Sequence, residues 1–333
     1  MSRLFLKAFC IPAGFAIVST SQAAANERII PTVFEAGHFY ATPTALNGQK
    51  VRLLADTGGA GFGGLYVLKK SAVSRLSATL TTCKLDDFNI DVVRSVSFLP
   101  DAGLAPVTTT RPCMADAMSV DNKVGDDTFD GMLGAGYLAR FVVTFDYPIH
   151  QLKVEADDWR PAAGAEQIPL IFPHNAQGKR ESDFPRVDLT IDGAPVHLLL
   201  DTGATAFPTP AGLAAQQIET VNGEGVTSYI TKSVFDRWHS HHPEWQVVEH
   251  GDHLMPDTRI IMVPEVYFGT ARVGPVWFTE RPDKNFGPKG MSMWMGQTVV
   301  GAAGANIYGK LKITIDYARE ALWLSPPKNR NIK

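Results

Sequence analysis

Two segments of the chain share one pattern of apolar and polar positions. Residues 38–55 and residues 187–200 each contain two short apolar-rich runs, separated by Asn47-Gly48 in the first segment and by Asp192-Gly193 in the second. These dipeptides favour the two-residue turns that join the strands of a β-hairpin. In both segments the second run leads directly into the triplet Asp-Thr-Gly, where glycine permits a tight turn. The pattern predicts two β-hairpins, each followed by a turn that presents an aspartate.

Most of the remaining periodicity also indicates strands. Residues 141–147 and 311–317 are alternating or apolar runs that follow Gly-rich turns. Helical periodicity is sparse, and its clearest instance is the segment 233–242, which ends before Pro243. The apolar face of this predicted helix consists of Val234, Phe235 and Trp238. We therefore predict an all-β fold with few short helices.

The chain contains an internal duplication. A shift of 145 positions superposes the two Asp-Thr-Gly triplets and their flanks, and a shift of 170 positions superposes two later Gly-rich segments. Because these offsets differ by 25 residues, the second half contains an insertion between its repeated blocks. Matches at the first offset include Gly48 with Gly193, Val51 with Val196, and Asp56-Thr57-Gly58 with Asp201-Thr202-Gly203. Matches at the second offset include Gly131 with Gly301, Gly134 with Gly304, and Asp146-Tyr147 with Asp316-Tyr317.

Length and composition are those of a globular protein with one large domain or two ordinary ones, of which we expect two. The chain has 333 residues, of which 45% are hydrophobic and 20% are charged, so disordered, collagen-like and disulfide-scaffold classes are excluded. The formal net charge of -3 gives no electrostatic case for a nucleic-acid partner. Ala, Gly and Pro accumulate at 161–166, where we place the junction between an N-terminal lobe, 26–160, and a C-terminal lobe, 161–333.

Residues 1–25 have the pattern of a secretory signal peptide. Arg3 and Lys7 give a positive start, residues 8–18 form an apolar stretch, and Ala23-Ala24-Ala25 is a small-residue cleavage signature. A membrane anchor, which is the alternative, needs nearly twice that apolar length, and no other stretch of the sequence approaches it. The sequence therefore predicts a periplasmic or secreted protein with no membrane span in the mature chain.

Two cysteines remain in the predicted mature chain, Cys83 and Cys113. Because export compartments are oxidising, we expect these residues to form a disulfide, and two buried free thiols are the alternative. A bridge over this span would stabilise the fold by about 3 to 4 kcal/mol.

The candidate chemistry lies in the two Asp-Thr-Gly triplets. One triplet arises by chance in roughly one chain in fifteen of this length, but two triplets at the same position of a repeat indicate a two-fold site with one carboxylate from each half. Two carboxylates that lie close together cannot both ionise freely, so such a pair shares one proton over a wide pH range. One carboxyl group can then act as a base while the other acts as an acid. Asp56 and Asp201 are therefore the candidate catalytic residues.

With these motifs the sequence resembles an aspartic peptidase of the pepsin and retropepsin group, of the bacterial type with two retropepsin-like lobes in one chain. The resemblance spans nearly the whole mature chain and includes Asp130-Gly131-Met132-Leu133-Gly134, the strand at 140–147 and the corresponding segment 301–317. It implies a bilobal pepsin-like acid protease fold with two homologous β-barrel-like lobes. It further implies a peptide or protein substrate in the interlobe cleft, no cofactor, no metal, and a monomer, because one chain supplies both lobes.

The resemblance also implies a role for each residue of the triplets. Asp56 and Asp201 would hold a water molecule, which the ionised carboxylate deprotonates as the water attacks a peptide carbonyl, while the protonated carboxyl group stabilises the oxyanion. Thr57 and Thr202 would form hydrogen bonds across the two loops and hold the carboxyl groups coplanar. Backbone amides would come from Gly58 and Gly203.

The sequence departs from the pepsin pattern in three respects. Gly59 and Ala204 stand where pepsins usually place Ser or Thr, and the loss of these donors raises the carboxyl pKa and predicts a less acidic pH optimum. No Tyr lies between Tyr66 and Tyr137, so the flap tyrosine is missing, although we expect the flap itself within 85–112. About ten residues separate the expected cleavage site from the first strand, too few for a pepsin-type propeptide.

Five of the nine histidines lie within 15 residues of the second half. The group could form a metal or pH-sensing site, since His-x-His-His resembles part of a metal-dependent hydrolase motif. However, the Asp-His that follows in such motifs is missing, and only two of the residues share a helix face. The alternative is a polar surface helix and loop in an insertion at about 230–255. The five residues are His239, His241, His242, His250 and His253.

Two other features leave alternatives open. In the second half, the apolar-apolar-Gly segment that corresponds to Met132-Leu133-Gly134 is either Ala302-Ala303-Gly304 or Val299-Val300-Gly301. Several aromatic residues could line substrate subsites or pack in the core. They are Tyr66, Trp277, Phe278 and Trp294.

The sequence supports an exported aspartic endopeptidase best. A non-catalytic pepsin-like protein that binds peptides or inhibitors is the alternative, and a metal-linked hydrolase is a third possibility. Both aspartates are intact, and a binding module has no need of two apposed carboxylates, because their proximity lowers stability. The sequence therefore favours catalysis.

Overall fold

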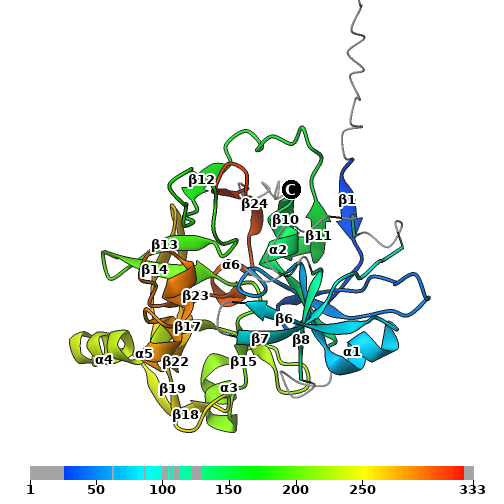
Figure 1. The fold of residues 1–333 in the computed structure, drawn as a ribbon. Helices are drawn as coiled ribbons and strands as arrows, with labels where there is room; N and C mark the ends of the chain where they lie inside the picture. Colours follow the sequence, from blue (N-terminus) through cyan, green and yellow to red (C-terminus); the bar gives the residue numbers. More distant parts are fainter. Residues whose placement is uncertain are drawn as a thin grey trace, which may run out of the picture.

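The computed structural model describes residues 26–61, 64–85, 88–99, 104, 105, 107, 113, 115–121 and 129–325. The predicted signal peptide, 1–25, and most of the 85–112 segment that we expect to contain the flap lie outside the described residues. Strands dominate the described part of the chain and helices are few and short, as the sequence predicts (Figure 1). Within these ranges every helix is too short or too polar to cross a lipid bilayer.

The first half of the chain forms one sheet of eight strands. In chain order these are β2 (Thr32–Glu35), β3 (His38–Ala41), β4 (Leu53–Asp56), β5 (Tyr66–Lys69), β6 (Leu80–Leu85), β7 (Phe88–Val93), β8 (Ala117–Val120) and β9 (Gly131–Gly134). In space their order is β2-β3-β4-β9-β5-β8-β7-β6, so β4, which ends at Asp56, lies inside the sheet. Two helices, α1 (Lys70–Arg75) and α2 (Ala135–Leu138), follow β5 and β9.

The second half forms a sheet of nine strands. These are β13 (Arg186–Ile191), β14 (Ala194–Leu200), β17 (Ser228–Thr231), β18 (Val247–Asp252), β19 (Thr258–Val263), β20 (Val266–Phe268), β21 (Ala271–Val273), β22 (Val276–Arg281) and β23 (Gly301–Ala303). Their spatial order is β18-β19-β22-β17-β23-β14-β13-β20-β21. A small sheet pairs β15 (Thr205–Ala206) with β16 (Gly225–Val226). The helical segments are α3 (Pro210–Gln216), α4 (Lys232–His241), α5 (Asp283–Phe286), η4 (Met291–Trp294) and α6 (Ala305–Tyr308).

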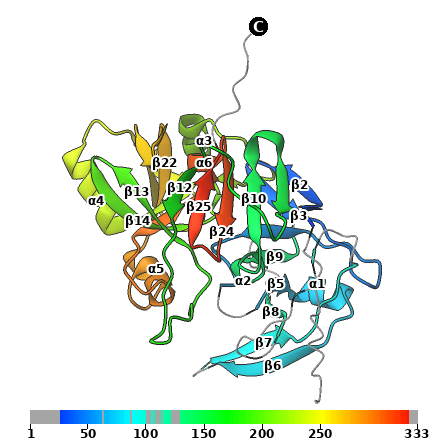
Figure 2. The same cartoon turned by 90° about the horizontal axis from the view of Figure 1, so that it is seen from above.

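A third sheet combines strands from both halves. Its six strands are β1 (Arg28–Ile30), β10 (Val142–Asp146), β11 (Gln151–Val154), β12 (Glu166–Pro169), β24 (Lys312–Asp316) and β25 (Ala321–Leu324), and the short helix η3 (Tyr147–Ile149) follows β10. At its centre β10 and β24 pair antiparallel (Figure 2). In this pairing Thr144 lies opposite Thr314, with 2.7 Å between the two hydroxyl oxygens. Because the sequence repeat matches these two threonines, a local two-fold axis passes between them.

The two large sheets repeat one strand topology. The parallel pair β4–β9 corresponds to β14–β23, and β5 and β17 then pair antiparallel with β9 and β23. Leu54 lies opposite Met132, and Leu199 lies opposite Ala302. Ala302 therefore corresponds to Met132, which selects the register at 302–304 for the apolar-apolar-Gly segment of the second half.

The 25 extra residues of the second half are inserted in two places, one before β17 and one after it. Val67 of β5 faces Met132 and Tyr229 of β17 faces Ala302, so equivalent positions in these strands are 162 residues apart. The offset is 145 before these strands and 170 after them. Most of the extra residues therefore precede β17, in the segment that contains α3, and the rest follow it.

The helix predicted at 233–242 is α4, displaced by one residue. Val234, Phe235 and Trp238 are buried, and the Trp238 ring packs edge-on against Phe278 of β22 at 5.4 Å between centroids. The periodicity of apolar residues thus identified both the helix and its buried face.

Most of the ambiguous aromatic residues are core residues. Tyr66 is buried with its ring 5.7 Å from that of Tyr137. Trp277 and Phe278 are also buried, while Trp294 is partly buried against a small apolar cluster that contains Phe286. Packing rather than substrate contact therefore accounts for Tyr66 and Phe278.

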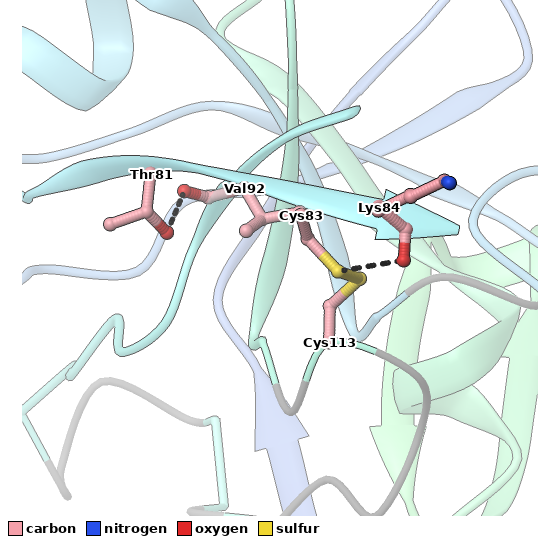
Figure 3. Close-up of a disulfide and its surroundings, with 5 residues drawn as sticks. All are labelled: Thr81, Cys83, Lys84, Val92 and Cys113. Carbon is pink, nitrogen blue, oxygen red and sulfur yellow. Dashed lines mark hydrogen bonds between the residues drawn. A yellow bond between two sulfur atoms is a disulfide. The ribbon is translucent and has the colours of Figure 1, made fainter. Parts of the chain in front are cut away.

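A disulfide joins Cys83 of β6 to Cys113, with the Cα atoms 5.8 Å apart (Figure 3). β6 is the edge strand of the eight-stranded sheet, so the bridge ties this edge to a distant part of the chain. We expect the double variant Cys83→Ser/Cys113→Ser to lose about 3 to 4 kcal/mol of unfolding free energy, because the bridge closes a loop of 30 residues. Urea unfolding measures this loss, and a reducing agent should reproduce it in the wild type. An unchanged midpoint in both experiments would contradict the prediction.

Candidate active site

The two Asp-Thr-Gly turns face each other. β4 ends at Asp56, and Asp201 directly follows β14. Each of these strands lies inside its sheet, with a paired strand on either side. Asp56 is buried and Asp201 is partly exposed. The structure thus brings the two aspartates of the sequence repeat into one site.

Gly58 and Gly203 let each turn approach the carboxyl group of the other. A Cβ atom on Gly58 would lie 2.6 Å from Cγ of Asp201, and one on Gly203 would lie 2.6 Å from Cγ of Asp56. A side chain at either position would collide with a carboxyl group, so both positions require glycine. The amides also donate hydrogen bonds within their own turns, from Gly58 to Asp56 Oδ1 at 2.7 Å and from Gly203 to Asp201 Oδ1 at 3.0 Å.

Thr57 and Thr202 join the turns through four reciprocal hydrogen bonds. The Thr57 amide donates to Thr202 Oγ1 at 3.1 Å, and the Thr202 amide donates to Thr57 Oγ1 at 3.0 Å. The Thr57 hydroxyl donates to the Leu200 carbonyl at 2.6 Å, and the Thr202 hydroxyl donates to the Ala55 carbonyl at 2.8 Å. Both side chains are buried. The hydrogen bonds predicted across the two loops are therefore present, and they fix the relative position of the carboxyl groups.

The environment separates the proton affinities of the two carboxyl groups. Burial raises the pKa of both, and the negative charge of Asp56 raises the pKa of Asp201 further. Amides of Gly58 and Gly59 and a hydrogen bond from Asp201 stabilise the charged form of Asp56 and oppose the rise of its pKa. At a pH between these two raised pKa values, the pair therefore holds one proton on Asp201 and one negative charge on Asp56.

Gly59 has no side-chain hydroxyl that could donate a hydrogen bond to Asp56, but its backbone amide does so. A Cβ atom on Gly59 would lie 2.5 Å from Asp56 Oδ2. In this geometry a hydroxyl-bearing residue would displace the carboxylate. The counterpart Ala204 is buried and provides no side-chain donor.

Sequence reasoning missed two buried side chains that support the Asp201 turn. His38 of β3 lies with Nε2 3.4 Å from Thr205 Oγ1 and hydrogen-bonds the backbone of Ala204. Burial lowers the pKa of His38 to about 4, so its imidazole is neutral above that pH. The Tyr308 hydroxyl donates to the backbone carbonyl of Asp201 at 2.9 Å. For His38, the signal in the sequence was a polar residue beside an apolar run, where a buried polar group requires a partner.

A pocket of about 200 Å³ opens beside Asp201. Gly58 contributes to it from the first half, and the remaining lining residues come from the second half. Arg281, the last residue of β22, is the one cation among the lining residues. No motif marked Arg281 in the sequence. The walls include Leu199, Tyr229, Phe286 and Met291.

The histidines lie on α4 and in the β18 segment. His242 is 2.8 Å from Asp192 and 3.2 Å from Glu244, and its ring stacks on Trp245. His250 forms an exposed ion pair with Asp257. Among the described residues, no three His, Cys, Asp or Glu side chains are grouped closely enough to hold a metal ion.

The sequence matches no protein-family model and no curated protein. The chemistry that the site allows must therefore be judged from its geometry. Two apposed carboxyl groups that share one proton can deprotonate a water molecule with one member and donate a proton with the other. The adjacent pocket can receive a side chain of the molecule on which the water acts.

Proposed function

We propose that the protein is an aspartic endopeptidase in which Asp56 and Asp201 activate water for attack on a peptide bond. The observation that carries the proposal is the reciprocal contact of the two Asp-Thr-Gly turns, which places one ionised and one protonated carboxyl group together. A simple binding protein gains nothing from this arrangement, because the burial of two neighbouring carboxyl groups lowers stability.

The proton distribution defines the mechanism. Asp56 accepts a proton from water as the water oxygen bonds to the carbonyl carbon, and Asp201 gives its proton to the carbonyl oxygen, so a neutral gem-diol forms. When the C–N bond breaks, Asp56 returns its proton to the leaving nitrogen, and Asp201 regains a proton from a hydroxyl group of the gem-diol. The dyad ends in its starting state.

The repeated topology supports a pepsin-like bilobal fold for this enzyme. Each half contributes one sheet with its aspartate at the end of an inner strand, and the shared sheet holds the two halves together. One chain thereby supplies both carboxyl groups, which supports a monomer. The leader pattern at 1–25 and the disulfide support a periplasmic or secreted location.

A digest of a peptide library tests the proposal against the non-catalytic alternative. The purified protein is incubated with the library between pH 3 and pH 8, and mass spectrometry identifies both the new termini and the peptides that stay bound. We expect new termini within extended peptides. Peptides that are retained without any cleavage would instead support a peptide-binding protein.

The acidic limb of the pH profile is expected above pH 4. Because burial raises the pKa of Asp56 above the ordinary aspartate value of about 3.9, the base becomes protonated and inactive as the pH falls through this raised value. Activity falls on the alkaline side when Asp201 loses its proton, and the higher pKa of Asp201 delays this loss. Measurement of kcat/KM against pH tests the prediction, and a maximum at pH 2 to 3 would contradict it.

A further inference from the structure

Arg281 is a buried cation in the pocket beside Asp201. Its side chain is 3% exposed, and its guanidinium carbon lies 4.0 Å from the centre of the Tyr229 ring. The Tyr229 hydroxyl is itself fixed, since it donates to the Thr205 carbonyl at 2.7 Å and accepts from the Thr205 amide at 2.8 Å. The stacking on Tyr229 therefore holds the guanidinium group in a defined orientation next to the Asp201 turn. Figure 1 shows β17 and β22, which carry these two residues, beside α5.

Among the described residues, no carboxylate lies within ion-pair distance of Arg281, and its charge acts on Asp201 and on the Tyr229 hydroxyl. Nη1 donates to the Glu280 carbonyl at 3.0 Å, whereas Nη2 is buried without a hydrogen-bond partner in the described part of the chain. The neighbouring acidic side chains are engaged elsewhere: Glu280 accepts from Arg259 at 2.6 Å, and Asp283 accepts from the Ser233 amide at 3.0 Å. A buried guanidinium group with an unpaired N–H is costly, because it loses its hydration without compensation.

The pocket around Arg281 suits a short side chain that ends in an anion. Leu199, Phe286 and Met291 provide apolar walls. Arg281, Asp201 and Asn285 provide polar positions. A guanidinium group with free N–H donors binds a carboxylate through paired charge-assisted hydrogen bonds. Because Asp201 also lines the pocket, an anion bound there lies close to the peptide bond on which the dyad would act.

We propose that this pocket is a substrate subsite for a carboxylate and that Arg281 is its ligand. The inference rests on the proposed function and specifies its substrate class: peptides with a carboxylate next to the scissile bond. That carboxylate belongs either to a Glu or Asp side chain or to the C-terminus of the peptide. Arg281 is thus a specificity-determining residue of the proposed peptidase, and the test distinguishes an internal acidic side chain from a C-terminal carboxylate.

Arg281 also lowers the pKa of Asp201 through its charge, and this effect defines the competing explanation. A residue that acts only on Asp201 changes the pH profile for every peptide equally. A carboxylate ligand instead changes the ratio of rates between acidic peptides and their amide analogues, and does so mainly through KM. The selectivity ratio therefore separates the two roles.

The test uses pairs of internally quenched peptides that differ in one carboxylate. One arm compares Glu with Gln at each of the three positions on either side of the scissile bond, in peptides with amidated C-termini. The other arm compares free with amidated C-termini in peptides that lack acidic residues. We expect about a ten- to hundredfold higher kcat/KM for the acidic member at one position adjacent to the scissile bond, as is typical of a hydrogen bond to a charged group. Binding of the acidic member should weaken as the pH falls towards the ordinary Glu pKa of about 4.3, and calorimetry can follow this loss where activity is too low to measure.

Variants assign the preference to Arg281. Arg281→Gln should reduce the selectivity ratio to about one, and Arg281→Lys should retain part of it, because Lys keeps the charge without the planar fork. The matched control Arg237→Gln removes an exposed charge of α4 in the same half and should leave the ratio unchanged. If Arg281→Gln does not fold, the reduced ratio expected of Arg281→Lys, compared with the unchanged ratio of Arg237→Gln, decides the question.

Failure of the subsite and failure of the proposed function give different results. Hydrolysis that depends on both aspartates but shows no carboxylate preference in either arm overturns the subsite alone. If no peptide is hydrolysed, the proposed function fails, and calorimetric binding of the same peptide pairs to the wild type tests the subsite. Equal affinity for both members of every pair would then overturn it.

Discussion

Asp56→Asn and Asp201→Asn are each expected to lower kcat/KM for peptide hydrolysis by about 10⁴-fold, the largest effect predicted for this protein. Asparagine at 56 cannot accept the proton of the attacking water, and asparagine at 201 cannot protonate the carbonyl oxygen. Because the two groups act as one unit, the double variant should lose little more activity than either single variant. Steady-state kinetics on one peptide substrate measures all three effects.

The same variants should keep or gain stability. The folded state raises the pKa of both carboxyl groups, so it loses stability as the pH rises through those raised values and a carboxyl group ionises. Asparagine does not ionise and avoids this loss, so at pH 7 the melting temperature should stay the same or rise. Asp158→Asn, at an exposed position, is the control that should change neither activity nor stability. Loss of activity together with loss of folding would assign the aspartates a structural role instead.

The double variant Thr57→Val/Thr202→Val is expected to lose at least about 4 kcal/mol of unfolding free energy. Valine keeps the shape of threonine but removes both hydroxyl groups, which leaves two amides and two carbonyl groups buried without partners. Each such group costs about 1 to 3 kcal/mol. Chemical denaturation measures the loss, and kcat should also fall because the carboxyl groups lose their fixed alignment.

Two controls identify the cross-loop hydrogen bonds as the cause. Thr57→Ser/Thr202→Ser keeps both hydroxyl groups and should recover most of the lost stability. Thr190→Val changes an exposed threonine of β13 and should have little effect. Equal destabilisation by the serine and valine variants would show that the methyl groups, rather than the hydrogen bonds, hold the turns together.

The local parts of the fold were predictable from the sequence. Asn47-Gly48 and Asp192-Gly193 marked the connections before β4 and β14, and the offset of 145 residues predicted that Asp56 and Asp201 occupy equivalent places. The apolar face of α4 was predictable because it repeats with the helical period over ten residues. These features depend on residues that are close in sequence or on direct internal similarity.

The supporting residues of the site were not predictable in the same way. Arg281 meets Tyr229 because β22 and β17 pair in parallel, and His38 meets Thr205 across 167 residues of chain. Such contacts depend on tertiary packing, and no short-range pattern records them. The choice between the registers at 299–301 and 302–304 likewise required the pairing of Ala302 with Leu199.

The proposal that two carboxyl groups from the two halves form one hydrolytic site is tested most directly by a single comparison. Wild type, Asp56→Asn and Asp201→Asn are incubated with the same peptide library, and new termini are counted by mass spectrometry at the pH optimum of the wild type. We predict internal cleavage by the wild type and almost none by either variant. Cleavage that persists in both variants, or a wild type that cleaves nothing between pH 3 and pH 8, would contradict the account.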